Sequence, residues 1–438
     1  AYKSSCENNG NSSYEFVKCK ILPAISYPSK IIVKGMREVN NLITLGKLER
    51  LSAYNSAESK RRFSSYNPGF NFNYSKGSRG KSGFLLLSNA NPKNNGKPNI
   101  ELWDLNNQKI LKKWNLKKAI KLITKLEGSV SYFNHPIIAN DNSIIFSTPS
   151  DGGYLLKVSS EGDVIGLNDQ YEFHHSLNFD NKGLIYACIS DKKLKTYREG
   201  FAILDANLNI LETHFIDDIY DSHKLKPRIY SSNSQDPVHI NDVQPIIKGN
   251  ADDTDSVLIS LKNNSSIIEY NFKSNNIAWI MDGFTSEQHD VDIVKNNPLE
   301  ISIFNNNLQT LEGKIKKVEN NEILFAKGFK KPKNSRDKLI YNYSPSTVDN
   351  YPKLSLRKED FKNLSQNLIP KTMYGGLHEF NKYENSIIIE EENHGRIFEY
   401  DMKSKRIMWS YINSDSKKER FFRLMWSRFY EENPLLKS

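Results

Sequence analysis

The sequence predicts an all-β fold: a six-bladed β-propeller with an N-terminal extension and a short C-terminal helix. A unit of strand, polar turn and strand recurs at intervals of roughly 45 to 65 residues, which is typical of propeller blades. Helical patterns are few. The 22 Tyr and 22 Phe among 438 residues supply large side chains that can fill a core.

The repeated unit begins near residue 84 and is clearest in five segments. Each has an alternating strand, a short polar turn and a second strand that often ends in Trp or a β-branched residue. The five segments begin at Ile100, Gly153, Phe201, Ser266 and Arg396. Most follow another apolar strand, such as GLIYACIS or SVLISLK. The wider gap at 307–384 is expected to hold one irregular copy around 339–343.

The segments outside the repeat have weaker patterns. The expected division is a loop-rich extension at 1–80, the propeller at 81–415, and a helix and tail at 416–438. Within the extension, 31–39 has the pattern of a strand and 46–57 that of a short helix. Residues 116–126 predict a surface helix capped by Asn115, and aromatic residues three and four apart predict a helix over 417–430.

Charge and cysteine usage bear on partners and location. The net charge is +10, but Lys and Arg are mixed with Asp and Glu, which disfavours a nucleic-acid binder. No apolar run approaches the roughly 20 residues that span a bilayer. Cys6 and Cys19 lie where a loop-closing disulfide would suit an oxidising compartment, whereas Cys188 is expected to be buried. Since the chain starts at Ala1, we expect a removed signal or anchor and a periplasmic or secreted protein. The oligomeric state is left open.

Histidines carry the strongest chemical signal among the candidate site residues. His174 and His175, His239, and His289 each begin or precede a strand at the start of a blade. Equivalent edges of successive blades converge on one central opening, so three blades would each deliver a histidine to one pocket. Asn241 follows His239 closely enough to hydrogen-bond a neighbouring group.

Two chemistries suit three histidines in one pocket. Neutral imidazoles could bind zinc with an open fourth position, as in a metal-dependent hydrolase or lyase. Alternatively, one histidine could be a nucleophile while the others bind an anion and transfer protons. A binding or scaffold propeller that keeps the histidines for anion recognition is a third hypothesis. His378, His394 and Arg396 are further candidates at the pocket rim, whereas His135, His214 and His223 are interpreted as surface or core residues.

Several motifs together resemble a known family. In chain order they are HHSLNFDNKG, DPVHIND, SVLISLKNNSSIIEYN, AWIMDG and QHDVDI with ISIFNNN. Their order is similar to that in the arylsulfotransferases that use no nucleotide sulfate donor and are built on a six-bladed propeller. The resemblance covers about residues 84–411 and is weakest at 308–374.

The resemblance implies a role for each matching position. His289 would accept the sulfuryl group and form a transient sulfohistidine. His239 and one histidine of the tandem pair, His175 rather than His174, would bind the sulfate oxygens and act as acid or base. The implied reaction moves a sulfuryl group from an aryl sulfate to a phenolic acceptor by a ping-pong mechanism, with no cofactor and no metal.

Two departures from the family pattern affect this expectation. Lys262 stands where the family has an arginine, and lysine keeps the positive charge but lacks the planar fork that grips two oxygens. No arginine follows Asn305, Asn306 and Asn307, where the family would supply one. These differences favour a weakened or redirected activity, or the binding propeller.

Overall fold

In the computed structural model, residues 58–438 form one compact unit and residues 1–57 a separate one. The structure describes residues 57–438 apart from 93–95, 128–129, 131, 149–152, 192–197, 226–235, 248–253, 297, 312–313, 328–340, 344–352, 357–360, 362–363, 366–367 and 437–438. The strand expected over 31–39, most of the helix over 46–57 and the pairing of Cys6 with Cys19 lie outside these residues.

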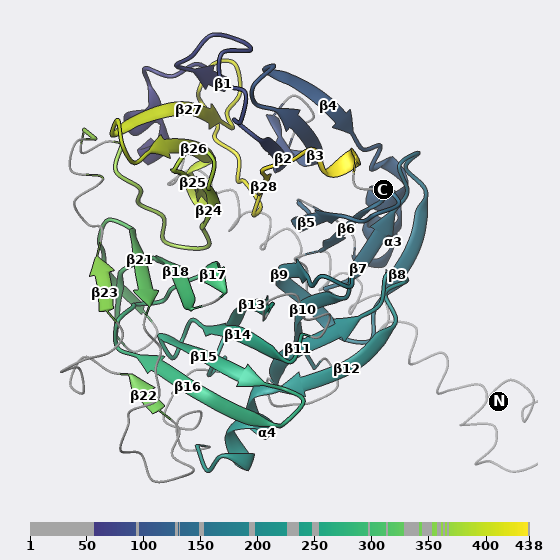
Figure 1. The fold of residues 1–438 in the computed structure, drawn as a ribbon. Helices are drawn as coiled ribbons and strands as arrows, with labels where there is room; N and C mark the ends of the chain where they lie inside the picture. The colour runs from purple at the N-terminus through teal and green to yellow at the C-terminus, as the bar shows by residue number, and fades with distance from the viewer. Residues whose placement is uncertain are drawn as a thin grey trace, which may run out of the picture. The chain divides into compact units, whose positions relative to one another are not determined.

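Six antiparallel blades surround a common centre, which confirms the predicted six-bladed β-propeller (Figure 1). The first blade orders β28 (Arg428–Tyr430), β2 (Phe84–Asn91), β3 (Lys97–Asp104) and β4 (Lys109–Lys113). The second contains β5 (Asn134–Ile138), β6 (Ile144–Ser147), β7 (Leu155–Val158) and β8 (Val164–Asn168). The third contains β9 (Glu172–Phe179), β10 (Ile185–Ser190), β11 (Glu199–Leu204) and β12 (Ile210–Phe215).

The remaining blades carry additions to the four-strand pattern. The fourth orders β13 (Ile240–Ile246), β14 (Ser256–Leu261), β15 (Ser266–Asn271), β16 (Asn276–Asp282) and β22 (Tyr341–Tyr343). The fifth orders β17 (Asp290–Asn296), β18 (Leu299–Asn305), β21 (Glu322–Lys327) and β23 (Lys353–Leu356), with a hairpin of β19 (Leu308–Leu311) and β20 (Lys314–Val318) before β21. The sixth contains β24 (Leu377–Asn381), β25 (Ser386–Glu391), β26 (Arg396–Asp401), β27 (Arg406–Ile412) and β1 (Gly69–Phe72).

Both ends of the described chain close the ring. The C-terminal strand β28 pairs with β2 of the first blade, with Phe429 opposite Leu85. The N-terminal strand β1 pairs with β27 of the last blade, with Phe70 opposite Tyr411. The first and last blades are therefore both completed by strands distant in sequence, so neither blade can form fully before the other end of the chain is present.

The prediction of a helix over 417–430 is wrong. This segment contains turns, isolated bridges and β28. Leu424, Met425 and Trp426 are buried there, and the Glu390 carboxylate accepts hydrogen bonds from the backbone N–H groups of Trp426 and Ser427. Pairing with the first blade outweighs the local helical spacing of the aromatic residues.

The other helices are short. The expected surface helix is confirmed as α3 (Lys117–Glu127), and Asn115 Oδ1 accepts a hydrogen bond from the Lys117 N–H. Residues 57–63 are also helical, and further helices are α4 (Ile216–Ser222) and the 3₁₀ turns η5 (Glu392–His394) and η6 (Pro434–Leu436). No helix in the described residues is long and apolar enough to cross a membrane.

The irregular blade expected around 339–343 is also misplaced. The fifth blade is built from β17, β18, β21 and β23, whereas β22 pairs in parallel with β16 at the edge of the fourth blade. The sequence around a three-residue strand contains no turn signal from which its partner strand could be predicted. The core consists of clusters of buried apolar side chains in and between blades, and Cys188 is fully buried as predicted.

Candidate active site

Four histidines from three neighbouring blades meet beside the centre of the propeller. His174 and His175 lie in β9, His239 directly precedes β13, and His289 directly precedes β17. The His175 ring centroid is 5.0 Å from that of His174, 4.9 Å from that of His239 and 6.3 Å from that of His289. The structure thus brings together the histidines selected from the sequence.

Left-handed backbone conformations mark the start of these inner strands. His175 and His239 have φ values of 51° and 50°, and Glu287, two residues before His289, has a φ of 55°. The pairing of β9 with β10 shifts register at His175, and that of β13 with β14 shifts between Ile240 and Asp242, just after His239. A non-glycine residue with positive φ is strained, and bulges of this kind often redirect side chains beside functional sites.

The tautomer of His289 is fixed by its neighbours. Asn306 Nδ2 donates to the carbonyl oxygen of Gly375 at 2.8 Å, which orients Asn306 Oδ1 as an acceptor. His289 Nδ1 lies 2.8 Å from this oxygen and 3.2 Å from the Glu287 carbonyl oxygen. Both are acceptors, so Nδ1 carries the proton. Nε2 therefore keeps its lone pair, and it has no hydrogen-bond partner among the described residues.

His289 is also held neutral. Its side chain is buried, and burial lowers its pKa well below the ordinary value. The positive charges of Lys262 and His239 lower it further, whereas the hydrogen bond to Asn306 acts in the opposite direction. A neutral imidazole with a free Nε2 is the form that can act as a nucleophile.

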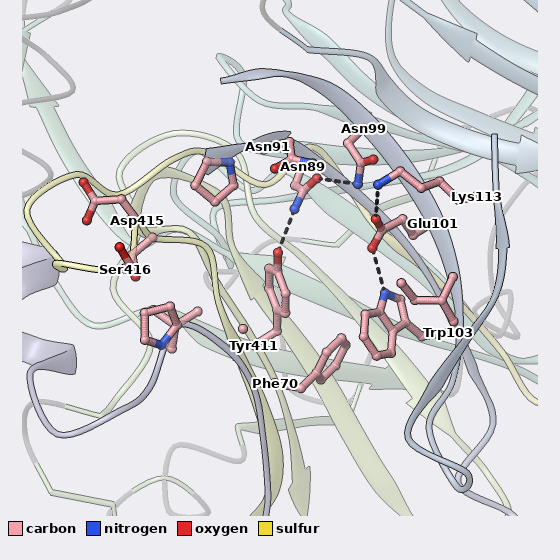
Figure 2. Close-up of a pocket in the computed structure, with 16 residues that line it drawn as sticks. Phe70, Asn89, Asn91, Asn99, Glu101, Trp103, Lys113, Tyr411, Asp415 and Ser416 are labelled. Carbon is pink, nitrogen blue, oxygen red and sulfur yellow. Dashed lines mark hydrogen bonds and ion pairs between the residues drawn. The ribbon is translucent and has the colours of Figure 1, made fainter. Parts of the chain in front are cut away.

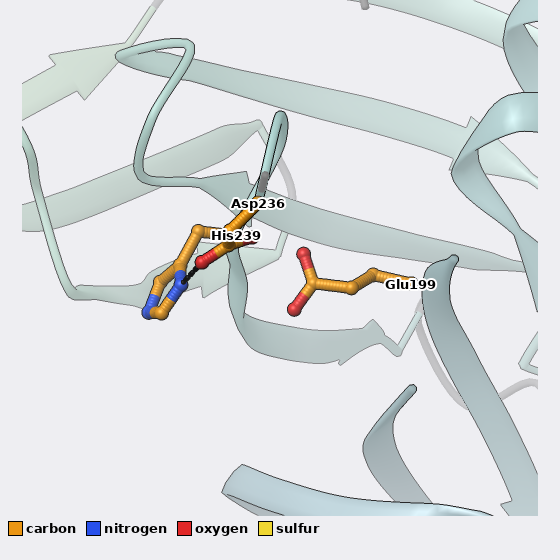
Figure 3. Close-up of side chains that lie close together, drawn as sticks. All are labelled: Glu199, Asp236 and His239. Atoms are coloured by element: carbon orange, nitrogen blue, oxygen red, sulfur yellow. Dashed lines mark hydrogen bonds and ion pairs between the residues drawn. The ribbon is translucent and has the colours of Figure 1, made fainter. Parts of the chain in front are cut away.

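His239 is paired with a carboxylate, as Figure 3 shows. Its Nδ1 contacts Asp236 Oδ2, and the Glu199 carboxylate lies near the same pair. Burial alone would raise the pKa of Asp236, but the hydrogen bond and charge of His239 lower it below the ordinary value. An ionised Asp236 favours a proton on His239 Nδ1 and leaves Nε2 for acid or base chemistry.

His174 and His175 form a coupled pair. Their Nδ1 atoms lie 2.8 Å apart, and His174 Nε2 is 2.9 Å from Ser190 Oγ and 3.6 Å from Glu199 Oε1. Burial lowers the pKa of His174 to about 3 and that of His175 well below the ordinary value, with a further contribution from the charge of His239. Both rings are therefore neutral at neutral pH and share one hydrogen bond.

Lys262 supplies a positive charge to this group. Its Nζ lies 3.4 Å from Glu287 Oε2 and 3.3 Å from Asn263 Oδ1, and its backbone N–H donates to the His239 carbonyl oxygen at 3.0 Å. The lysine is thus tied to both the His239 loop and the loop before His289. We refer to His174, His175, His239, Lys262 and His289 as the histidine centre.

Asn241 and His378 connect the inner strands of neighbouring blades. Asn241 Nδ2 donates to the Gln288 carbonyl oxygen at 2.8 Å, directly before His289. His378 is buried, with Nδ1 2.8 Å from Asp290 Oδ2 and Nε2 2.7 Å from Ser302 Oγ. Both nitrogens of His378 therefore have partners, and it lies in a second polar cluster rather than among the four histidines.

Two candidate residues lie elsewhere. His394 Nδ1 lies 2.9 Å from Ser59 Oγ. Arg396 is fully buried, contacts Glu391 and lies over the Phe63 ring. The contacts of His394 and Arg396 anchor the N-terminal edge of the described unit to the last blade, and neither residue contacts the histidine centre.

Sequence reasoning did not single out five residues that shape the centre. Asp236, Glu199, Glu287 and Asn306 orient or surround its members, and Trp426 places its ring centroid 5.8 Å from that of His175. Asp236 carried a local signal, because it stands three residues before His239. Glu287 stands two residues before His289, and Asn306 follows the strand that pairs with β17. Glu199 and Trp426 are distant in sequence from the histidines that they approach, so only the fold relates them to the centre.

The second polar cluster makes stability depend on pH. Asp242 is fully buried, and burial raises its pKa to about 6, while burial also raises the pKa of Asp290, Asp292 and Glu379 nearby. A carboxyl group whose pKa is higher in the folded than in the unfolded protein stabilises the folded state when it is protonated. This stabilisation is complete below the unfolded pKa near 4 and is lost as pH rises through the folded pKa of about 6. The Asp242 contribution therefore grows as pH falls from 8 to 5.5, whereas buried histidines with a lowered pKa, such as His378 in the same cluster, lose stability over this range.

The contribution of Asp242 to the free energy of unfolding is on the order of 3 kcal/mol once it is complete near pH 4, and roughly 1 kcal/mol of it develops between pH 8 and 5.5. Scanning calorimetry across this pH range, on the native chain and on Asp242→Asn, measures it. Because the histidines are the same in both proteins, the stability of the native chain relative to the variant should increase as pH falls. Glu391, whose pKa is lowered to about 2, acts only below pH 4.5 and does not affect this window. A stability difference between native chain and variant that stays constant or decreases from pH 8 to 5.5 would contradict the assignment.

Comparison of the sequence with known proteins relates this chain to a family. Two family models, each described as Arylsulfotransferase (ASST), match residues 131–283 and 212–414. Together they span about two thirds of the chain and include the whole histidine centre. No curated protein matches the chain.

Three solved structures illustrate the similarity in fold. A protein of unknown function from Bacteroides caccae has 10% identity and a TM-score of 0.40, with 75% of this chain and 93% of that one covered. The β-propeller domain of Myceliophteria thermophila Cps50 (Swd1) has 10% identity and a TM-score of 0.40, with 74% and 86% covered. The periplasmic gluconolactonase PpgL of Pseudomonas aeruginosa has 8% identity and a TM-score of 0.43, with 80% and 99% covered. These distant matches carry no argument about function.

Proposed function

Because this chain belongs to the arylsulfotransferase family, we propose that it transfers a sulfuryl group from an aryl sulfate to a phenolic acceptor through His289. The observation that carries the proposal is the neutral, oriented imidazole of His289, whose Nε2 is the nitrogen left with a lone pair. Lys262 and two further histidines surround it, which suits a group with negative charge on its oxygens.

The first half-reaction forms a sulfohistidine. Nε2 of His289 attacks the sulfur of the aryl sulfate, an N–S bond forms, and the S–O bond to the aryl group breaks. His239, protonated beside Asp236, gives its Nε2 proton to the leaving phenolic oxygen. Positive charge that develops on the His289 ring is stabilised by its Nδ1–H donating to Asn306 Oδ1.

The second half-reaction reverses these steps with a new phenol. His239 removes the phenol proton, the phenolic oxygen attacks sulfur, and the N–S bond breaks to restore neutral His289. Lys262 and His175 face the sulfuryl oxygens in both halves and stabilise their charge. One pocket thus serves donor and acceptor in turn, and the proton passes from acceptor to leaving group with none gained or lost.

A chromogenic transfer assay tests the proposal. Purified protein is incubated with an aryl sulfate such as 4-nitrophenyl sulfate, with and without phenol and without a nucleotide donor. Release of nitrophenol should depend on phenol, and phenyl sulfate should form in equal amount. Absence of transfer across a panel of donors and acceptors would favour the binding propeller instead.

Asp236 should tune the acid–base step. We expect Asp236→Asn to lower kcat by about 10- to 100-fold and to shift the acid limb of the pH–rate profile, because an amide no longer stabilises the protonated His239. The KM for the donor should change little, since Asp236 is not among the groups that face the sulfate. Nitrogen-15 NMR of the histidine rings gives a second readout. If Asp236→Asn kept the kcat and the pH–rate profile of the native chain, the pair would have no such role.

A metal-dependent hydrolase or lyase is a second candidate. Ligand atoms of Glu199, Asp236 and His239 lie within 4.8 Å of one another, as an ion would require. However, His239 Nδ1 already contacts Asp236, so a metal at that nitrogen would have to displace the contact. Elemental analysis of purified protein and activity after chelation separate the two functions. Stoichiometric zinc and loss of activity on chelation would favour the metal enzyme.

A further inference from the structure

A second pocket lies where the last blade meets the first. It has a volume of about 540 Å³ and is lined from β1 and β27 on one side and from β2, β3 and β4 on the other (Figure 2). None of its lining residues belongs to the histidine centre. A pocket of this size is large enough for a small ligand, so we examined which ligand its chemistry suits.

Three half-buried aromatic rings form one wall. The Phe70 centroid lies 4.5 Å from that of Trp103 and 4.9 Å from that of Tyr411, and the ring planes are inclined by 48° and 58°. The wall is therefore angular rather than flat. Such a surface suits the apolar face of a puckered ring better than an extended planar one.

Polar side chains with fixed orientation complete the pocket. Glu101 Oε2 accepts from Trp103 Nε1 at 3.1 Å, and Oε1 accepts from Lys113 Nζ at 2.6 Å. Asn89 Nδ2 donates to the Tyr411 hydroxyl at 2.8 Å, and Asn99 Nδ2 donates to Asn89 Oδ1 at 3.2 Å. Figure 2 shows these bonds, which place both donors and acceptors along one edge of the pocket.

The charge and hydrogen-bonding pattern select a ligand class. Glu101 and Lys113 neutralise each other, which favours a neutral ligand over an anion. Each carboxylate oxygen has further lone pairs, and the half-exposed ammonium has further N–H groups. Adjacent hydroxyl groups both donate and accept, so they match an edge with both donors and acceptors. We propose that this pocket binds a neutral pyranose sugar, with one face on the aromatic wall and hydroxyls on Glu101 and Lys113.

Binding of simple glycosides tests this site without any catalytic assay. Saturation-transfer NMR and calorimetry are run with the methyl pyranosides of glucose, mannose and galactose, with glucuronate, and with 4-nitrophenol as a flat aryl probe. At least one neutral glycoside should bind saturably, and glucuronate should bind more weakly. Glu101→Gln should weaken that binding by about tenfold or more, because a charged acceptor is lost while the side-chain size is kept.

Glu269→Gln is the matched control. Glu269 also accepts a hydrogen bond from a tryptophan, Trp279, but it does not line the pocket. Its substitution should leave glycoside binding unchanged, and melting temperatures confirm that both variants fold. Failure of every glycoside to bind, or equal effects of the two variants, would overturn the proposal. So would binding of 4-nitrophenol that is tighter than that of all glycosides and is weakened by Glu101→Gln, because 4-nitrophenol bound at the histidine centre would be unaffected by that substitution. Because no turnover is measured, the result is independent of sulfuryl transfer.

Discussion

Replacing His289 with alanine should lower kcat/KM for phenol-dependent sulfuryl transfer by at least about 10⁴-fold, because the reacting nitrogen is removed. The assay is nitrophenol release from 4-nitrophenyl sulfate with added phenol. In native protein incubated with donor alone, intact mass spectrometry at neutral pH should also show a transient increase that corresponds to one sulfuryl group. Neither signal should occur in His289→Ala.

His214→Ala provides the control for removal of a histidine. His214 lies in the outer strand β12 and stacks on Phe201, with ring centroids 4.9 Å apart and planes inclined by 22°. It has no contact with the histidine centre, so its loss should change kcat/KM less than about threefold. If His289→Ala kept activity within tenfold of the native chain, a different residue would have to be the nucleophile.

The fold could be predicted because its units are local. Each hairpin, such as β15 with β16, is encoded by alternating apolar residues around a polar turn, and the repetition of that pattern indicates a propeller. The closing strands were not predictable in this way. β1 and β28 find their partners at the opposite end of the chain, and the aromatic spacing around Trp426 fits a helix as well as an extended segment.

The site was predicted in its residue types but not in its geometry. His175, His239 and His289 stand at blade starts, where propeller geometry brings side chains together. The contact of Asn306 with His289 depends on the register of the β17–β18 hairpin, and that of Glu287 with Lys262 on loops that meet across blades. Residue types alone encode neither. The same reason explains His394, whose place before the last blade suggested the rim although its side chain contacts Ser59.

His135 is a core residue, one of the two settings expected for it, but its partners were not predictable. No motif marks it in the sequence, yet its ring is buried. The ring centroid lies 5.3 Å from that of Trp426, and Nε2 lies 2.6 Å from Arg428 Nη2. Arg428 comes from the closing strand β28, so this contact exists only once the ring is closed. Residues whose partners come from the closing strands are the ones that local patterns miss.

Under the proposed mechanism, we expect the charge of Lys262 to determine how well the centre binds the sulfuryl group. Lys262→Met keeps the length of the side chain but removes its charge, and we expect kcat/KM to fall by about 10²- to 10³-fold, as when one donor to a developing anion is lost. Lys262→Arg should keep activity within about threefold or increase it, since guanidinium restores the two-oxygen grip of the family residue. Glu287 and Asn263 can accept from either cation.

Steady-state kinetics with varied aryl sulfate, on all three proteins, measure this effect. A parallel measurement of sulfate inhibition shows whether ground-state anion binding changes with the charge. If Lys262→Met loses activity and Lys262→Arg retains it, the positive charge acts on the sulfuryl group, and lysine is a working substitute for arginine. If all three proteins have equal rates and equal sulfate inhibition, Lys262 only pairs with Glu287, and the histidines stabilise the transferred group without it.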